Sequence, residues 1–183
     1  MISLSQLPNL ITFSRIALVP VLILVLKDQD YAAALAVFLV AGASDALDGF
    51  IAKRFGFTSR LGAVLDPVAD KTLLVGTYVM LTLLGQVPFW LLLTVAFRDL
   101  LIIGGYLVYI SLHGAVQMQP TPLSKFNTLV QIALVVAILA HEAMGWSLPA
   151  LIEGMTWLVF VTTVASGAHY VWIWGMKKHG GTA

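Results

Sequence analysis

Four aspartates lie close together in a chain that has few charged residues. The chain is 183 residues long, 60% hydrophobic and 10% charged, and four of its nine acidic residues are Asp45, Asp48, Asp66 and Asp70. Carboxylates repel one another and are costly in apolar surroundings, so a cluster of this kind needs a cation. Their oxygens are the ligands that hard divalent ions such as Mg²⁺ prefer. The cluster therefore predicts a divalent-metal site.

The spacing of the aspartates predicts two helix ends that meet. Asp45 and Asp48 are three residues apart, which places both on one face of a helix. Asp66 and Asp70 are four residues apart and share a face if their helix begins by about residue 63. If that helix begins later, Asp66 caps it and Pro67 takes the first helical position.

Small residues and one lysine occupy fixed places among the aspartates. Gly49, Ala52 and Gly62 leave the approach to the carboxylates open, and Lys53 adds a positive charge. The alternative interpretation makes the aspartates solvated loop residues, but a loop needs neither this spacing nor the glycines. The whole pattern reads Asp45-x2-Asp48-Gly49-x2-Ala52-Lys53-x8-Gly62-x3-Asp66-x3-Asp70.

This pattern resembles the signature of the CDP-alcohol phosphatidyltransferases, in which DxxDGxxAR is followed, after eight residues, by GxxxDxxxD. Every spacing matches. Lys53 stands where the family usually has arginine, which keeps the charge but loses the bidentate fork of a guanidinium. The resemblance implies an enzyme that moves a phosphatidyl group from CDP-diacylglycerol to an alcohol and releases CMP.

The composition predicts an integral membrane protein, because soluble domains carry about 25% charged residues. A spanning helix needs about 20 mostly apolar residues, and six stretches of the chain qualify. We predict an all-α protein of six transmembrane helices, a CDP-alcohol phosphotransferase bundle by resemblance, in a single domain over residues 1–183. The predicted spans are about 9–26, 31–52, 63–84, 88–112, 123–140 and 148–175.

The chain contains no cysteine, which excludes disulfides and thiol chemistry. Residues 10–26 lack a basic region before them and a small-residue cleavage site after them, so we interpret them as a retained span and not a signal peptide. The net charge of +1 says little about partners, and we expect no nucleic-acid partner.

Basic residues predict the orientation of the six spans. An even number of spans places both termini on one side, together with the loops at about 53–60 and 113–124. That side collects Lys53, Arg54, Arg60, Lys71, Lys125, Lys177 and Lys178, whereas Lys27 stands on the other. We therefore predict a membrane location of the bacterial inner-membrane type, with both termini and the active site on the cytoplasmic side.

The start of the first predicted span carries Asn9, Thr12 and Arg15 on one helical face. In the family that the pattern resembles, a PNxxTxxR start accompanies the aspartate motif and lines the CDP site. The alternative is that Arg15 extends to the lipid headgroups.

The resemblance implies two Mg²⁺ or Mn²⁺ ions held by the four aspartates. Asp45, Asp48 and Asp66 would be metal ligands, and Asp70 would be both a ligand of the second ion and the candidate base for the acceptor hydroxyl. Lys53 would meet the CDP phosphates, while Gly49, Ala52 and Gly62 would let the nucleotide approach the backbone. The expected partners are CDP-diacylglycerol, a glycerol-type acceptor, membrane lipids and a second copy of the chain.

Two further basic residues are candidates for binding the acceptor. Arg98 and Asp99 lie inside the fourth predicted span, where a charge is rarely without function; a structural Arg–Asp pair between helices is the alternative. Lys125 opens the fifth predicted span. It either anchors that helix at the headgroups or meets an acceptor or a phosphate, and the resemblance favours the second interpretation.

Several stretches of the sequence bear on the identity of the acceptor alcohol. The PNLITFSRI start and the LDPVADK stretch are similar to the glycerol branch of the family. Phosphatidylglycerophosphate synthases carry a second arginine after the position of Arg98 and a GKxK pair, whereas this chain has Gly104, Gly105 and Asn127 at those places. We predict phosphatidylglycerol as the acceptor and cardiolipin as the product, with glycerol 3-phosphate as the alternative acceptor.

Two other classes of protein place aspartates inside a helical bundle. A Mg²⁺ transporter would have no need for the interleaved glycines or the basic residue at fixed spacing. An intramembrane prenyltransferase would be longer and would repeat the aspartate motif in a second half, which this chain lacks.

The metal site leads to a first testable prediction. Asp48→Asn should remove the release of CMP from CDP-diacylglycerol without unfolding the helices, because the remaining carboxylates repel one another without completing the coordination shell. The measurement is CMP release by the purified variant at saturating Mg²⁺, with circular dichroism as the control for folding. Turnover near that of the wild type would contradict the assignment of Asp48.

Overall fold

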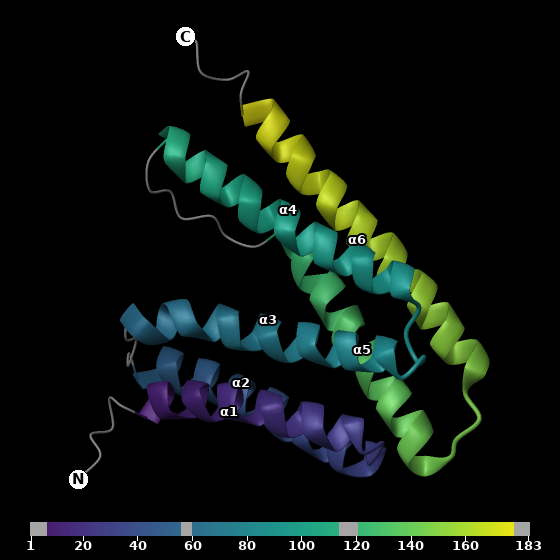
Figure 1. Cartoon of the computed structure of the whole chain (residues 1–183). Coiled ribbons are helices and arrows are strands. Elements are labelled where there is room, and N and C mark those ends of the chain that lie inside the picture. The colour runs from purple at the N-terminus through teal and green to yellow at the C-terminus, as the bar shows by residue number, and fades with distance from the viewer. Residues whose placement is uncertain (1–6, 56–59, 114–120, 178–183) are drawn as a thin grey trace. The chain divides into compact units, whose positions relative to one another are not determined.

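The protein is built from helices throughout the part of the chain that the structure describes. The computed structural model describes the backbone of residues 7–55, 60–113 and 121–177, and the side chains of residues 16–44, 71–105 and 121–173. The helices in these ranges are α1 (Leu7–Lys27), α2 (Tyr31–Phe55), α3 (Arg60–Leu83), α4 (Phe89–His113), α5 (Pro122–Met144) and α6 (Pro149–Lys177) (Figure 1). Each predicted span coincides with one of them, which confirms the all-α prediction.

The start of α3 decides between the two interpretations of its aspartates. The helix begins at Arg60, ahead of residue 63, so Asp66 and Asp70 are four residues apart within one helix and Asp66 does not cap it. The apolar run alone placed the start three residues too late, because Arg60 and Leu61 belong to a helical turn that is not itself uniformly apolar.

Specific backbone conformations terminate the helices. Gly85 ends α3 with a φ of 79°, a left-handed conformation that glycine adopts without steric cost, and the amide of Gln86 reaches back to the carbonyl of Leu81 at 2.8 Å. The turn between α1 and α2 uses Gln29 in the same conformation, with a φ of 57°. Asp30 then caps α2, since its Oδ1 accepts a hydrogen bond of 3.0 Å from the amide of Ala33.

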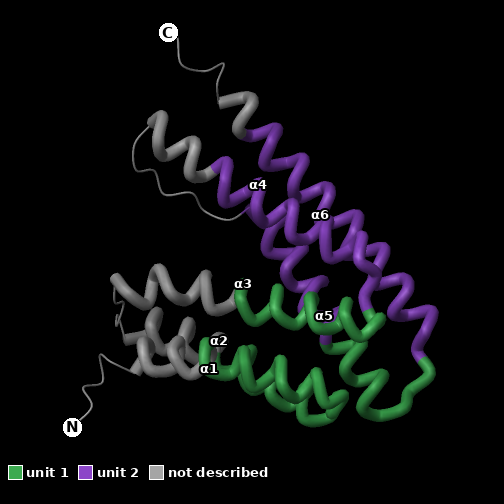
Figure 2. The backbone as a smooth tube through the Cα atoms, viewed as in Figure 1, with its two compact units in different colours: residues 1–86, 136–147 green, residues 87–135, 148–183 purple. Residues whose placement is uncertain are grey.

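The chain forms two compact units, which Figure 2 colours separately. The first consists of Met1–Gln86 and Val136–Ser147, and the second of Val87–Val135 and Leu148–Ala183. In the first unit, α1 packs against both α2 and α3. At Gly76, α3 faces Val19 of α1, and a Cβ at this position would make an ordinary van der Waals contact of 3.6 Å with Cγ1 of Val19.

In the second unit, α4 packs along α6, and the first half of α5 belongs to the same unit. Its core contains the buried apolar side chains of Leu91, Leu134 and Val159. An aromatic cluster joins α4 to α6, with the ring centroid of Trp90 5.4 Å from those of Trp157 and Phe160. Such tilted and edge-on contacts suit the quadrupoles of the rings.

The surface carries large apolar side chains, and the mostly apolar interior also contains several polar ones. Leu83 and Phe97 are 75% and 69% exposed, for example. The buried polar or charged side chains of the described residues are Thr77, Arg98, Asn127, Gln131, Thr156, Thr162, Thr163 and Ser166. Among the described residues, Pro122–Met144 and Pro149–Ile173 are long and apolar enough to cross a membrane. These features support association with a membrane, whose hydrocarbon would cover the apolar surface.

Candidate functional site

The four aspartates lie on two helices of the first unit. Asp45 and Asp48 belong to α2, and Asp66 and Asp70 belong to α3, and both helices pack against α1. The backbone therefore carries both pairs at helical spacing. The metal arrangement stays a prediction, because the four side chains lie outside the described residues.

The predicted CDP-binding residues fall on the same helices. The first group, Asn9, Thr12 and Arg15, lies in α1, and Gly62 lies in α3. The others, Gly49, Ala52 and Lys53, lie in α2. Their side-chain environment also lies outside the described residues, so their role in nucleotide binding stays a prediction.

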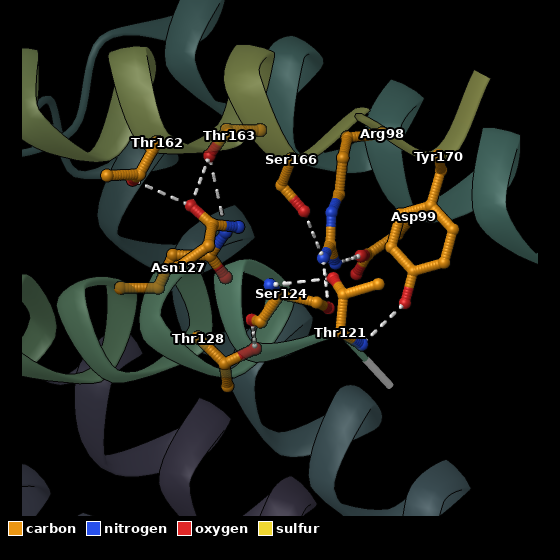
Figure 3. Close-up of polar contacts among 11 residues, drawn as sticks. Arg98, Asp99, Thr121, Ser124, Asn127, Thr128, Thr162, Thr163, Ser166 and Tyr170 are labelled. Carbon is orange, nitrogen blue, oxygen red and sulfur yellow. Dashed lines mark hydrogen bonds and ion pairs between the residues drawn. The ribbon is translucent and has the colours of Figure 1, made fainter. Parts of the chain in front are cut away.

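The second unit contains a buried arginine at the meeting point of three helices (Figure 3). Arg98 of α4 is 5% exposed. Its Nη1 donates to Oδ1 of Asp99 at 2.7 Å, and its Nη2 donates to Oγ of Ser166 in α6 at 2.8 Å and to Oγ of Ser124 in α5. We call these four residues, Arg98, Asp99, Ser124 and Ser166, the Arg98 clamp.

Electrostatics explains the composition of the Arg98 clamp. A guanidinium among apolar helices loses its hydration, and it is tolerated only when a counter-charge and hydrogen-bond acceptors replace the water. Asp99 supplies the counter-charge from the next position of the same helix. The alternative interpretation of the sequence, an Arg–Asp pair that bridges two helices, is therefore wrong for this pair. The interhelical partners of Arg98 are the serine hydroxyls.

Local sequence fixes the start of α5 beside the clamp. Thr121 caps the helix, because its Oγ1 accepts from the amide of Ser124 at 3.2 Å and its carbonyl accepts from the amide of Lys125 at 3.1 Å. Pro122 takes the first helical position, where its missing N–H costs nothing. The hydroxyl of Tyr170 in α6 accepts from the amide of Thr121 at 3.3 Å, and Lys125 itself is exposed.

Further along α5, a polar seam continues against α6 (Figure 3). Asn127 is fully buried, and its Oδ1 accepts hydrogen bonds from the hydroxyls of Thr162 at 2.8 Å and Thr163 at 2.9 Å. Gln131 donates to the hydroxyl of Thr163 at 3.5 Å. Thr121 contacts Tyr170, and Asn127, six residues further along the chain, contacts Thr162 and Thr163, so the two helices are antiparallel here.

Sequence reasoning missed the α6 side of this arrangement. Thr163, Ser166 and Tyr170 recur at intervals of three and four residues in a strongly apolar helix, which places them on one face. That period was the available signal. It was weak, because a serine or threonine in an apolar helix can equally bond to its own backbone, as Thr156 does with the carbonyl of Ile152 at 2.7 Å.

These observations define an all-helical, membrane-associated protein with carboxylate pairs on two helices that both pack against α1. The chain belongs to the CDP-alcohol phosphatidyltransferase family, whose sequence model matches residues 5–167. The matched range includes all the aspartates of the motif, as well as Arg98 and Lys125. The resemblance noted in the sequence is thereby confirmed.

Several relatives of named activity are similar to the chain. A cardiolipin synthase (CMP-forming) of Rattus norvegicus is 34% identical over 93% of this chain and 62% of its own length. A probable cardiolipin synthase (CMP-forming) of Drosophila melanogaster is 33% identical over 97% of this chain and 59% of its own length. The chain therefore spans about three fifths of the length of these relatives. A CDP-diacylglycerol–glycerol-3-phosphate 3-phosphatidyltransferase of Bacillus subtilis is 29% identical over 90% of this chain and 93% of its own length.

The polar seam leads to a second testable prediction. Thr163→Val should lower the free energy of unfolding in detergent by about 1 kcal/mol, because it removes hydrogen bonds to Asn127 and Gln131 of the neighbouring helix. Thr156→Val is the matched control, since its hydroxyl bonds within α6 and its loss should cost under about 0.5 kcal/mol. Equal losses in the two variants would contradict an interhelical role for Thr163.

Proposed function

We propose that the protein transfers a phosphatidyl group from CDP-diacylglycerol to a glycerol-type acceptor and releases CMP. The observation that carries this proposal is the aspartate motif at residues 45–70, which matches the family signature at every spacing and lies inside the matched range. The named relatives are CMP-forming enzymes or use CDP-diacylglycerol, which supports the same donor for this chain.

The donor set fits a divalent-metal site. It consists of four carboxylates in two helical pairs, the hard oxygen ligands that Mg²⁺ and Mn²⁺ prefer, on helices that pack against a common neighbour. We propose that Asp45, Asp48, Asp66 and Asp70 hold two ions. Bound there, the ions would neutralise the pyrophosphate and stabilise the departing CMP.

The residues of the chain would bind and orient the two substrates. Asp70 would accept the proton of the acceptor hydroxyl, while the acceptor oxygen bonds to the phosphatidyl phosphorus and the bond from that phosphorus to CMP breaks. Lys53 would contact the CDP phosphates as a point charge. The rest of the proposed nucleotide site consists of Asn9, Thr12, Arg15, Gly49, Ala52 and Gly62.

We place the acceptor at the first turn of α5, where Lys125 lies exposed beside the Arg98 clamp. Phosphatidylglycerol is the preferred acceptor and cardiolipin the preferred product, because two cations, Arg98 and Lys125, match a phosphodiester with one charge better than a dianionic phosphate monoester. Glycerol 3-phosphate is the second candidate, and the similarity to the Bacillus subtilis enzyme favours it.

The arrangement in the membrane is also part of the proposal. We propose six spans that coincide with α1 to α6, in a membrane of the bacterial inner-membrane type. Both termini and the active site would face the cytoplasm, which agrees with the distribution of basic residues. Residues 1–183 would act as one catalytic domain and associate as a homodimer.

The proposed function leads to a third testable prediction. Purified protein with Mg²⁺ and CDP-diacylglycerol should release CMP and form cardiolipin when phosphatidylglycerol is added, with little product from glycerol 3-phosphate. The measurements are CMP release and lipid analysis with each acceptor separately, and the Asp48→Asn variant is the control for background.

Two other outcomes would contradict different parts of the proposal. Product from glycerol 3-phosphate and none from phosphatidylglycerol would contradict the acceptor while leaving the aspartate chemistry in place. Absence of CMP with every acceptor would contradict the proposed enzyme, as expected of a Mg²⁺ transporter or of a prenyltransferase acting on other substrates.

A further inference from the structure

The guanidinium of Arg98 is enclosed by the protein. Both of its terminal nitrogens donate to protein acceptors, Nη1 to Asp99 and Nη2 to Ser124 and Ser166 (Figure 3). Its Nε is also buried, without a partner among the described residues. An acceptor phosphate could reach this guanidinium only by displacing contacts that compensate its lost hydration.

The contacts of Arg98 link all three helices of the second unit at one level. Asp99 belongs to α4, Ser124 to α5 and Ser166 to α6. A guanidinium can make such a link because it carries five N–H donors in a rigid plane, whereas the ammonium of a lysine is a point charge on a flexible stem. The residue type therefore fits a role in holding helices together as well as a role in supplying charge.

The link to α5 falls on the turn that presents Lys125. Ser124 precedes Lys125 directly, and both belong to the first turn after the Thr121 cap. The Lys125 side chain is exposed and flexible, so the direction in which its ammonium lies depends on the position of the backbone turn that carries it. Holding that turn in place lowers the entropy that is lost when an anionic acceptor binds.

We propose that Arg98 is a positioning residue, which acts through Ser124 on the first turn of α5 and so directs Lys125 towards the acceptor. Asp99 and Ser166 hold the guanidinium in the orientation that this requires. The inference rests on the proposed function and refines the part of Arg98 in it. Lys125 then supplies the direct cation, which suits the single negative charge of a phosphodiester acceptor.

A double-mutant cycle tests the coupling of Arg98 to Lys125. The variants are Arg98→Lys, Ser166→Ala, Lys125→Gln and the two doubles with Lys125→Gln, assayed for CMP release with whichever acceptor the wild type uses. Ser166→Ala and Arg98→Lys should each raise the acceptor KM by about fivefold, somewhat below the full value of a hydrogen bond to a charged group. The kcat and the KM for CDP-diacylglycerol should stay within about twofold of wild type.

The doubles decide between positioning and direct contact. If Arg98 acts through Lys125, neither change should raise the acceptor KM further in the Lys125→Gln background. The proposal would be overturned if the fold-increase in acceptor KM of the Arg98→Lys/Lys125→Gln double variant equalled the product of the increases in the two single variants. An unchanged acceptor KM in Ser166→Ala would overturn it as well. Thr156→Val is the matched control on α6, where the lost hydroxyl lies outside the clamp and both KM values should be unaffected. Wild-type protein that releases no CMP would instead contradict the proposed function.

A spectroscopic measurement tests the positioning independently of activity. The chain has no cysteine, so Lys125→Cys provides a single site for a nitroxide spin label in the whole protein. The electron paramagnetic resonance spectrum of this label should show greater mobility when Arg98→Lys or Ser166→Ala is added. Adding Thr156→Val should leave the spectrum unchanged. An unchanged spectrum with Arg98→Lys would overturn the proposal even where the doubly substituted enzymes are inactive.

Discussion

A guanidinium buried among apolar helices dictates the polar interior of the second unit. Arg98 loses its hydration on burial, and the protein compensates with the carboxylate of Asp99 and the hydroxyls of Ser124 and Ser166. Because these groups come from three helices, compensating the charge also fixes those helices to one another. The burial of these polar groups fits a membrane environment, since hydrocarbon offers no hydrogen bonds to polar groups on the surface.

The first unit presents a different problem, four carboxylates at helical spacing within 26 residues of one another. Basic residues lie near the four carboxylates of α2 and α3 in the sequence, so the metal ions that we propose there rest on the spacing of the aspartates and not on a lack of cations. In the second unit the counter-charge is the next residue of the chain, and a ligand is not needed to complete it. We propose that the aspartates form a site that binds metal ions, whereas Arg98 has its counter-charge and hydrogen-bond acceptors within the chain.

The sequence predicted the helices and the aspartate motif because both depend on local patterns. Apolar runs located the helices to within a few residues, and fixed spacings marked residues 45–70. The partners of Arg98 were not predictable in the same way, because Ser166 lies 68 residues away and serine hydroxyls in apolar helices commonly bond to their own backbone. The pairing of Arg98 with its chain neighbour Asp99 was likewise hidden, since adjacent residues on a helix point in different directions unless a long side chain bends back.

The Arg98 clamp bears on the acceptor through the charge that it leaves exposed. Of the lysine and arginine side chains that the structure describes in the second unit, Arg98 is buried and paired with Asp99, while Lys125 is exposed. Arg98 adds little attraction for an anionic acceptor, because its charge is already offset by a carboxylate 2.7 Å away. In the proposed acceptor site, the single charge of Lys125 would then balance the single charge of a phosphodiester. A lipid acceptor held in the bilayer also needs fewer attractive contacts than a soluble one, because the membrane already confines it beside the helices.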